Sequence, residues 1–174
     1  MRDKSTKFPL PDHPQDYTSI RIWHCSYKSV EGLKYFSNLK SLEIATLPNN
    51  NLDFLAGLSQ LETLRILHMP HIKDITTLST LSSLKHITLE TLPSWDSSGK
   101  QTIVDSLAPL RSLKLLETLT LYGIIPADND YSCLSGGGAL LEFNILRRYK
   151  GAKESLDALH KEKPNLKGSF LECL

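Results

Sequence analysis

Cysteine has the widest chemistry of the residue types in this sequence, because its thiolate can bind a metal ion or attack a substrate. The three cysteines, Cys25, Cys133 and Cys173, are odd in number and far apart, without the paired spacing of a zinc site or a redox motif. We therefore expect reduced thiols, and we expect the chain to use no metal ion and no cofactor.

Two glycine-containing segments share part of the pattern of a phosphate-binding loop. The segment SGKQT, residues 98–102, has no glycine five residues before Gly99, and Gln101 stands where serine or threonine is needed. The segment SGGG, residues 135–138, precedes ALLEFNI, which has the pattern of a strand rather than of the helix that a phosphate cradle needs. We interpret the first segment as a loop and the second as a turn.

The stretch 147–167 is rich in basic residues, which is typical of a nucleic-acid contact or of a solvated helix face. Its basic residues are Arg147, Arg148, Lys150, Lys153, Lys161, Lys163 and Lys167, and its acidic residues are Glu154, Asp157 and Glu162. No aromatic side chain other than Tyr149 is interleaved with them. We favour the solvated face and keep nucleic-acid binding as the alternative.

Length and composition indicate one ordinary globular domain. The chain has 174 residues, 40% of them hydrophobic and 22% charged, and its 20 basic and 19 acidic residues leave a formal charge of +1. No overall field therefore attracts nucleic acid, an anionic membrane or an acidic substrate. Residues 1–16 contain no apolar signal-peptide core, and no run of about eighteen uncharged apolar residues occurs. We expect a cytoplasmic protein with no membrane contact.

One pattern of apolar residues recurs along the chain. It is found in Tyr17-Ile20-Ile22-Cys25, Leu39-Leu42-Ile44-Leu47, Leu61-Leu64-Ile66-Met69 and Leu84-Ile87-Leu89-Leu92, whose starts are 22, 22 and 23 residues apart. It continues from Leu116, Leu140 and Leu166, at steps of 32, 24 and 26 residues. A period of this size is typical of a solenoid, in which each repeat buries its apolar face against its neighbours.

These segments resemble the strand segments of leucine-rich repeats over residues 17–148. Upstream of each strand, apolar residues three apart, such as Leu33, Phe36 and Leu39, are similar to the short repeat class of about 22 residues with 3₁₀-like return turns. The resemblance implies an α/β solenoid with a curved parallel sheet of six or seven short strands and a convex side of 3₁₀ or short helical turns. The asparagine usual at the ninth repeat position is missing, and a proline follows the strand instead, as at Pro48.

The longest step of the repeat contains an insertion, residues 93–110. Ser97 or Ser98 can cap a helix there, and that helix would place Ile103, Val104 and Leu107 on its inner side.

The segments outside the repeats, residues 1–16 and 149–174, are expected to cap the solenoid. Phe8 and Leu10 of the proline-rich arm can cover the first repeat. At the other end we predict a helix over residues 152–162, with Leu156 and Leu159 inward, and then a weak last strand from Leu166. A free edge on that strand would allow a weak dimer, and we otherwise expect a monomer.

Outward positions of in-register parallel strands form rows across the concave face. One row is Arg21, Glu43, Arg65, Thr88, Thr120, Asn144 and Phe170, and the next is Trp23, Ala45, Leu67, Glu90, Tyr122, Leu146 and Glu172. The charged residues can form a self-compensated surface ladder or a binding site, and both interpretations stay open. Trp23, Leu67 and Tyr122 indicate partner binding, because an outward sheet position is polar unless something covers it. Packing against a cap is the alternative for Trp23.

The histidines are too far apart in this register to share a metal ion. His68 and His86 are offset by about 16 Å along the strands, and His24 and His68 lie two strands or roughly 10 Å apart. A zinc ion needs each nitrogen near about 2 Å. The register also brings no histidine to a serine or cysteine, so no nucleophile is indicated. We expect solvated or interface histidines.

The resemblance to leucine-rich repeats implies a non-catalytic module that binds another protein on its concave face. The expected contact residues are Arg21, Trp23, Glu43, Arg65, Leu67, His68, His86, Glu90, Tyr122, Asn144 and Leu146. An adaptor, a regulatory subunit and an inhibitor that covers the active site of a toxin all fit this sequence. A nucleic-acid-associated protein is the alternative, and an enzyme is the third possibility.

Overall fold

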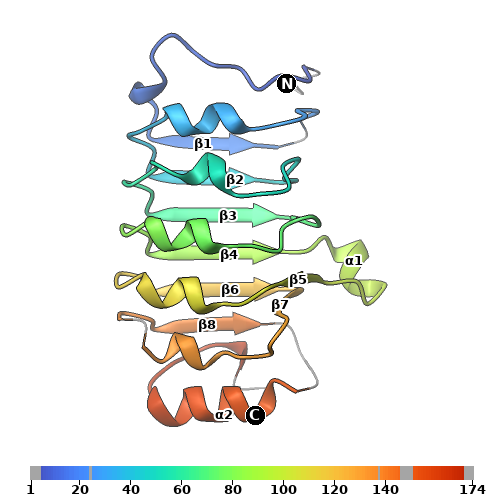
Figure 1. Cartoon of the computed structure of the whole chain (residues 1–174), viewed down its shortest axis with the longest axis vertical. Coiled ribbons are helices and arrows are strands. Elements are labelled where there is room, and N and C mark those ends of the chain that lie inside the picture. The colour runs from blue at the N-terminus through green and yellow to red at the C-terminus, as the bar shows by residue number, and fades with distance from the viewer. Residues whose placement is uncertain (1–4, 24, 137, 146–150, 171–174) are drawn as a thin grey trace.

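The computed structural model describes residues 5–23, 25–136, 138–145 and 151–170. Within these residues, six parallel strands form one sheet and follow each other in chain order, as Figure 1 shows. They are β1 (Ser19–Ile22), β2 (Ser41–Ile44), β3 (Thr63–Leu67), β4 (His86–Glu90), β6 (Thr118–Tyr122) and β8 (Glu142–Ile145). The expected stack of short strands is confirmed.

Short helical turns cover one face of this sheet and leave the other face open. The return segments are the 3₁₀ turns η2 (Glu31–Tyr35), η3 (Asp53–Leu55), η4 (Thr76–Thr80), η5 (Ala108–Ser112) and η6 (Ser132–Leu134). This confirms the short repeat class with 3₁₀ turns. Helices in the described ranges are too short and too polar to cross a bilayer.

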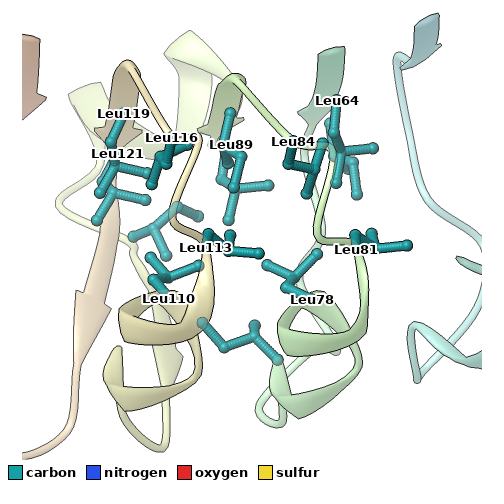
Figure 2. Packing of buried hydrophobic residues seen from close by; sticks show 14 of the residues in the cluster. Leu64, Leu78, Leu81, Leu84, Leu89, Leu110, Leu113, Leu116, Leu119 and Leu121 are labelled. Atoms are coloured by element: carbon teal, nitrogen blue, oxygen red, sulfur yellow. The ribbon is translucent and has the colours of Figure 1, made fainter. Parts of the chain in front are cut away.

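The repeated apolar residues fill the space between the sheet and the turns. Leu64 and Leu119 are fully buried, as expected, because alternate strand residues face the same side. Residues three apart share one side of a 3₁₀ turn, so Leu78 and Leu110 also point inward. Figure 2 shows Leu78 and Leu110, which are equivalent residues of neighbouring repeats, side by side at matching positions above their return turns.

Each return turn begins with a polar side chain that bonds the backbone of the turn. In each case a side-chain oxygen accepts the backbone N–H two residues later, at 2.7–3.2 Å. The acceptors are Ser29, Asn51, Asp74, Ser106 and Asp130, one for each turn. These bonds satisfy N–H groups that a tight turn leaves without a backbone partner.

The helix predicted within the insertion is wrong. The short helix α1 (Pro93–Ser97) ends where that helix was to begin. Residues 102–104 form the strand β5 (Thr102–Val104), which pairs with β7 (Ile124–Pro126) in a second small sheet. Val104 is buried but Ile103 is 57% exposed, which is the alternation of a strand. The β-branched run Thr-Ile-Val favours a strand, and this preference outweighs the possible serine cap.

The amino-terminal arm covers the first repeat with one of its two predicted residues. The ring of Phe8 packs edge-on against Tyr27 and Phe36, with centroids 5.5 and 6.0 Å away. Leu10 is 54% exposed, so its predicted packing is wrong. The 3₁₀ turn η1 (Pro14–Asp16) then leads into β1.

The carboxyl-terminal helix is confirmed and the last strand is not. The helix α2 (Lys153–Glu162) buries Leu156 and Leu159. Of the predicted strand, only Lys167 makes an isolated bridge, to Glu142, and Phe170 turns inward and is fully buried. Residues 171–174 lie outside the described residues. In the described part of this end, the returning chain bonds the edge of β8. Whether the protein forms a dimer stays a prediction.

Candidate functional site

The sheet register places the first predicted row side by side on the concave face. Arg21 lies opposite Glu43, Glu43 opposite Arg65, and Arg65 opposite Thr88, and the row continues through Thr120 to Asn144. Only the last member is wrong, because the side chain of Phe170 is in the core.

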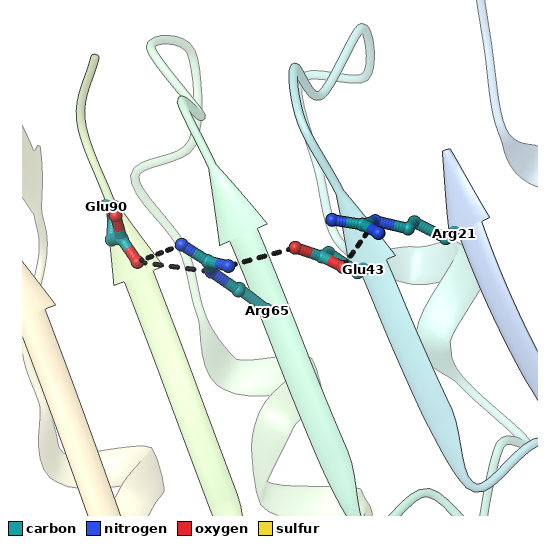
Figure 3. Close-up of polar contacts among 4 residues, drawn as sticks. All are labelled: Arg21, Glu43, Arg65 and Glu90. Carbon is teal, nitrogen blue, oxygen red and sulfur yellow. Dashed lines mark hydrogen bonds and ion pairs between the residues drawn. The ribbon is translucent and has the colours of Figure 1, made fainter. Parts of the chain in front are cut away.

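Four charged side chains form a continuous ladder across β1 to β4, which Figure 3 shows. Arg21 Nε lies 2.9 Å from Glu43 Oε2, and Glu43 Oε1 lies 3.0 Å from Arg65 Nη1. The ladder then steps to the next row, since Arg65 donates to Glu90 Oε1 from Nη2 at 3.1 Å and from Nε at 3.2 Å. The self-compensated ladder is therefore present, and each exposed pair contributes about 0–1 kcal/mol.

The second row is apolar on both sides of Glu90. Leu67 lies opposite Glu90, and Glu90 lies opposite Tyr122. Trp23 and Ala45 follow the ends of β1 and β2, and the guanidinium of Arg21 lies 4.5 Å from the centre of the Trp23 ring. Trp23, Ala45, Leu67 and Tyr122 are all half-buried, so each keeps surface that a partner can cover.

A hollow of about 400 Å³ opens beside this row at the carboxyl ends of β1 to β3. Its walls include Trp23, Ala45, Pro48, Leu67 and Leu92. Ala45 is the small residue between two large ones on neighbouring strands, and this difference in size leaves the depression. We refer to it below as the concave hollow.

His68 is not the solvated or interface histidine that we expected. It is only 8% exposed, its φ is 70°, and its ring packs edge-on against Trp95 with centroids 4.6 Å apart. Its N–H donates to the carbonyl of Glu90, and its carbonyl accepts the N–H of Leu47. Trp95 of α1 covers the ring, and burial, with a smaller effect of His71, lowers the pKa of His68.

The remaining predicted contact residues are scattered. His86 is half-buried, and its Nδ1 lies 2.9 Å from the Thr118 hydroxyl. Asn144 is bound into the far end of the sheet, because its Oδ1 accepts the N–H of Ser169. His24 and Leu146 lie outside the described residues.

Two features of this face were missed by sequence reasoning. Leu92 and Pro48 line the concave hollow, although the sequence placed Leu92 only in the repeated apolar pattern and Pro48 only after the end of a strand. A second charged ladder runs before the strands, where Lys85 Nζ lies 2.8 Å from Glu62 and Lys40 lies 3.8 Å from it. Lys85 lowers the pKa of Glu62 by a hydrogen bond and by its charge. This second ladder could have been predicted by the same alignment of the repeats, because Lys40, Glu62 and Lys85 each stand two residues before the first apolar residue of a strand.

The side chains on this face offer apolar contact and hydrogen bonding. No cluster of three histidine, cysteine or acidic residues that could hold a metal ion occurs among the described residues. Burial, with smaller contributions from Asp130 and Asp128, raises the pKa of Cys133 to about 11 and so keeps its thiol protonated near neutral pH.

Of the basic carboxyl-terminal stretch, Lys153, Lys161 and Lys167 are exposed. Arg147, Arg148 and Lys150 lie outside the described residues. Whether this stretch contacts nucleic acid stays a prediction.

Two solved structures of internalins, which are leucine-rich repeat proteins, resemble this chain. An internalin (inlF) of Listeria monocytogenes matches with a TM-score of 0.59 and 19% identity, over 78% of this chain and 38% of that one. The chain has the leucine-rich repeat fold. Internalin C2 (inlC2) of the same organism matches with a TM-score of 0.54 and 20% identity, over 79% of this chain and 57% of that one.

This chain therefore spans 38% and 57% of the length of the two proteins with the same leucine-rich repeat fold. No protein-family model matches the sequence, and no curated protein matches it. The function has to be argued from the concave face itself.

Proposed function

We propose that this chain is a non-catalytic module that binds a partner protein on its concave face, with the concave hollow at the centre of the contact. The hollow carries this proposal. It is an apolar depression walled by Trp23 and Leu67 on the face of a sheet that nothing in the described chain covers. Large apolar side chains in such a depression are the residues that contribute most to protein interfaces.

The charges around the hollow support an apolar contact. Glu43, Arg65 and Glu90 already pair within the chain, so a partner gains little by replacing these pairs. Binding would instead remove water from Leu67, Trp23 and the hollow, at about 25 cal/mol for each Å² of apolar surface. An adaptor, a regulatory subunit and a toxin inhibitor remain the candidate roles, and we propose a cytoplasmic location for all three.

The test is affinity capture from lysate with Leu67→Arg as the disrupting variant and Leu115→Arg as its matched control. Leu115 is exposed and lies in the loop before β6, outside the concave face, so it receives the same change of side chain. We expect the wild type and Leu115→Arg to retain a partner that Leu67→Arg loses. Circular dichroism establishes that all three proteins are folded.

Two results would contradict the proposal. A partner retained equally by all three proteins would place the contact outside the concave hollow. Binding of labelled DNA or RNA that weakens steeply with salt would favour the nucleic-acid alternative, since an apolar contact depends little on salt.

A further inference from the structure

In the described part of the chain, the two edge strands of the main sheet, β8 and β1, differ in whether their outward backbone groups are hydrogen-bonded. At β8, the N–H of Phe143 donates to the carbonyl of Lys167, and the N–H of Lys167 donates to the carbonyl of Leu141. The Ser169 hydroxyl accepts the N–H of Ile145 and donates to its carbonyl. The returning chain therefore satisfies the backbone of this edge strand without adding a full strand.

At the other edge, β1 has half of its backbone groups facing outward. The carbonyls of Thr18 and Ile22 accept N–H groups of Ser41 and Ala45, which fixes the side of β1 that faces β2. Because backbone groups alternate along a strand, those of Ser19 and Arg21 point to the opposite side. Within the described residues, no hydrogen bond is made to these outward backbone groups.

The described part of the amino-terminal arm, from residue 5 onward, passes this edge without pairing with it. Figure 1 shows the arm beyond β1, at the end of the stack. It is attached at one point by the carbonyl of Thr6, which accepts the N–H of Lys28, and at another by the carbonyl of Gln15, which accepts the Asn38 amide. Pro9 and Pro11 lie between these points and have no N–H to donate.

An apolar cleft of about 330 Å³ remains between the arm and β1. Its walls include Phe8, Leu10, Tyr17, Ile20, Ile22 and Phe36. Ile20 is only half-buried, whereas its equivalents Leu42 and Leu64 on the next two strands are fully buried. The cleft is thus the unfilled end of the repeat core, and one more strand with inward apolar side chains would complete it.

The positive charge of Arg21 at the β1 edge indicates which residue an added strand should carry between its two apolar side chains. Arg21 begins the ladder of alternating charge, and within residues 5–23, 25–136, 138–145 and 151–170 it has a carboxylate, that of Glu43, on one side only. Its side chain is 64% exposed. A strand added beside β1 would place an outward residue next to Arg21, and an acidic residue there continues the alternation.

We propose that the β1 edge binds an extended peptide in which an acidic residue stands between two apolar residues. The peptide runs parallel to β1 and adds a strand to the sheet. Its apolar side chains enter the cleft, its carboxylate pairs with Arg21, and its backbone bonds the outward groups of Ser19 and Arg21. The sequence Leu42-Glu43-Ile44 of β2 already meets these requirements on the opposite side of β1.

The probe is therefore a blocked synthetic peptide with the sequence of residues 39–46, LKSLEIAT, added to the ¹⁵N-labelled full-length chain. We expect the largest amide shifts at Ser19 and Arg21. A second peptide carries N-methyl groups on the residues equivalent to Leu42 and Ile44, whose N–H groups would face β1. Loss of two hydrogen bonds should weaken binding about tenfold or more.

Charge reversal tests the pairing with Arg21. Arg21→Glu should weaken the peptide roughly fivefold and strengthen a version with lysine in place of glutamate. Lys34→Glu is the matched control, because Lys34 lies on η2 at the same end of the stack and is exposed. We expect it to leave both affinities unchanged.

Three results would overturn the proposal: no binding of the unmodified peptide at millimolar concentration, equal binding of the N-methylated peptide, or amide shifts centred on Leu67. All three are measured on wild-type protein, so they decide the proposal even if a variant fails to fold. The last of them would assign the peptide to the concave hollow, and the Leu67→Arg variant distinguishes the two sites.

Discussion

Replacing Asp130 by alanine should loosen the carboxyl-terminal helix and leave the rest of the stack intact. Asp130 Oδ1 accepts the N–H of Ser132 at 2.7 Å and the Ser155 hydroxyl at 3.0 Å, and its Oδ2 accepts the Ser132 hydroxyl at 3.0 Å. Ser155 Oγ also accepts the N–H of Tyr131 at 2.6 Å. One carboxylate therefore joins the start of η6 to the first turn of α2.

The expected loss is about 1–2 kcal/mol. A hydrogen bond to a charged group contributes about 1.5–3 kcal/mol, but Asp130 is exposed and solvent reduces this value. The expected loss of stability is similar to that caused by removing the side chain that caps a helix. Because each repeat of a solenoid contacts only its neighbours, the effect should stay local. Amides of α2, such as that of Leu156, should exchange with solvent roughly tenfold faster.

Hydrogen exchange measured by NMR tests this expectation, with Asp157→Ala as the control. Asp157 is an exposed carboxylate on α2, so its loss removes a charge from the same helix without removing the contacts of Asp130. Equal exchange of the α2 amides in wild type and Asp130→Ala would refute the reasoning, as would equal acceleration in β2 to β4.

The same carboxylate predicts a pH dependence. Hydrogen bonds from Ser132 lower the pKa of Asp130 below its ordinary value of 3.8, although burial opposes them. The stabilisation is therefore complete above the unfolded pKa and is lost as the pH falls through the lower folded pKa. The difference in α2 exchange between wild type and Asp130→Ala should disappear in that acidic range.

The core, the charged ladder and the half-buried thiol of Cys133 each give a further expectation. Leu64→Ala should lower the free energy of unfolding in urea by about 2–5 kcal/mol, because the leucine is fully buried, and an unchanged midpoint would contradict its core position. Arg65→Met should cost less than about 1 kcal/mol for each lost pair, and the difference from wild type should shrink in 1 M salt, whereas a salt-independent loss would point to packing. Cys133, whose pKa is raised to about 11, should react slowly with iodoacetamide at pH 8 and faster as the pH rises, and rapid labelling at pH 8 in a variant with only this cysteine would contradict its burial.

The regular repeats could be predicted from the sequence because the spacing of their apolar residues follows from the geometry of a strand and of a 3₁₀ turn. Alternation in the strand and a period of three in the turn place Leu64 and Leu78 on one apolar side, whatever the neighbouring loops do. Once the register is known, the row of Arg21, Glu43 and Arg65 follows from counting.

The wrong predictions concern residues whose environment the repeat pattern does not determine. Ile103 lies in the insertion, and its strand depends on a partner, β7, that local sequence does not indicate. His68 is buried against Trp95, which belongs to the insertion, and the repeat pattern does not indicate that contact. Phe170 follows the last repeat, where the chain must close the core instead of continuing the sheet.

Alternating charge connects the concave face to the open edge. In a parallel in-register sheet, equivalent side chains lie beside one another, so like charges at one position would repel. Glu43 and Arg65 each have an opposite charge on both sides, and they leave little for a partner to pair with. Among the described residues, Arg21 has such a neighbour on one side only, because β1 is the edge strand of the sheet. A partner protein on this face should therefore bind through Leu67 and the concave hollow, while a charged strand should bind at β1, and Leu67→Arg and Arg21→Glu should block the two separately.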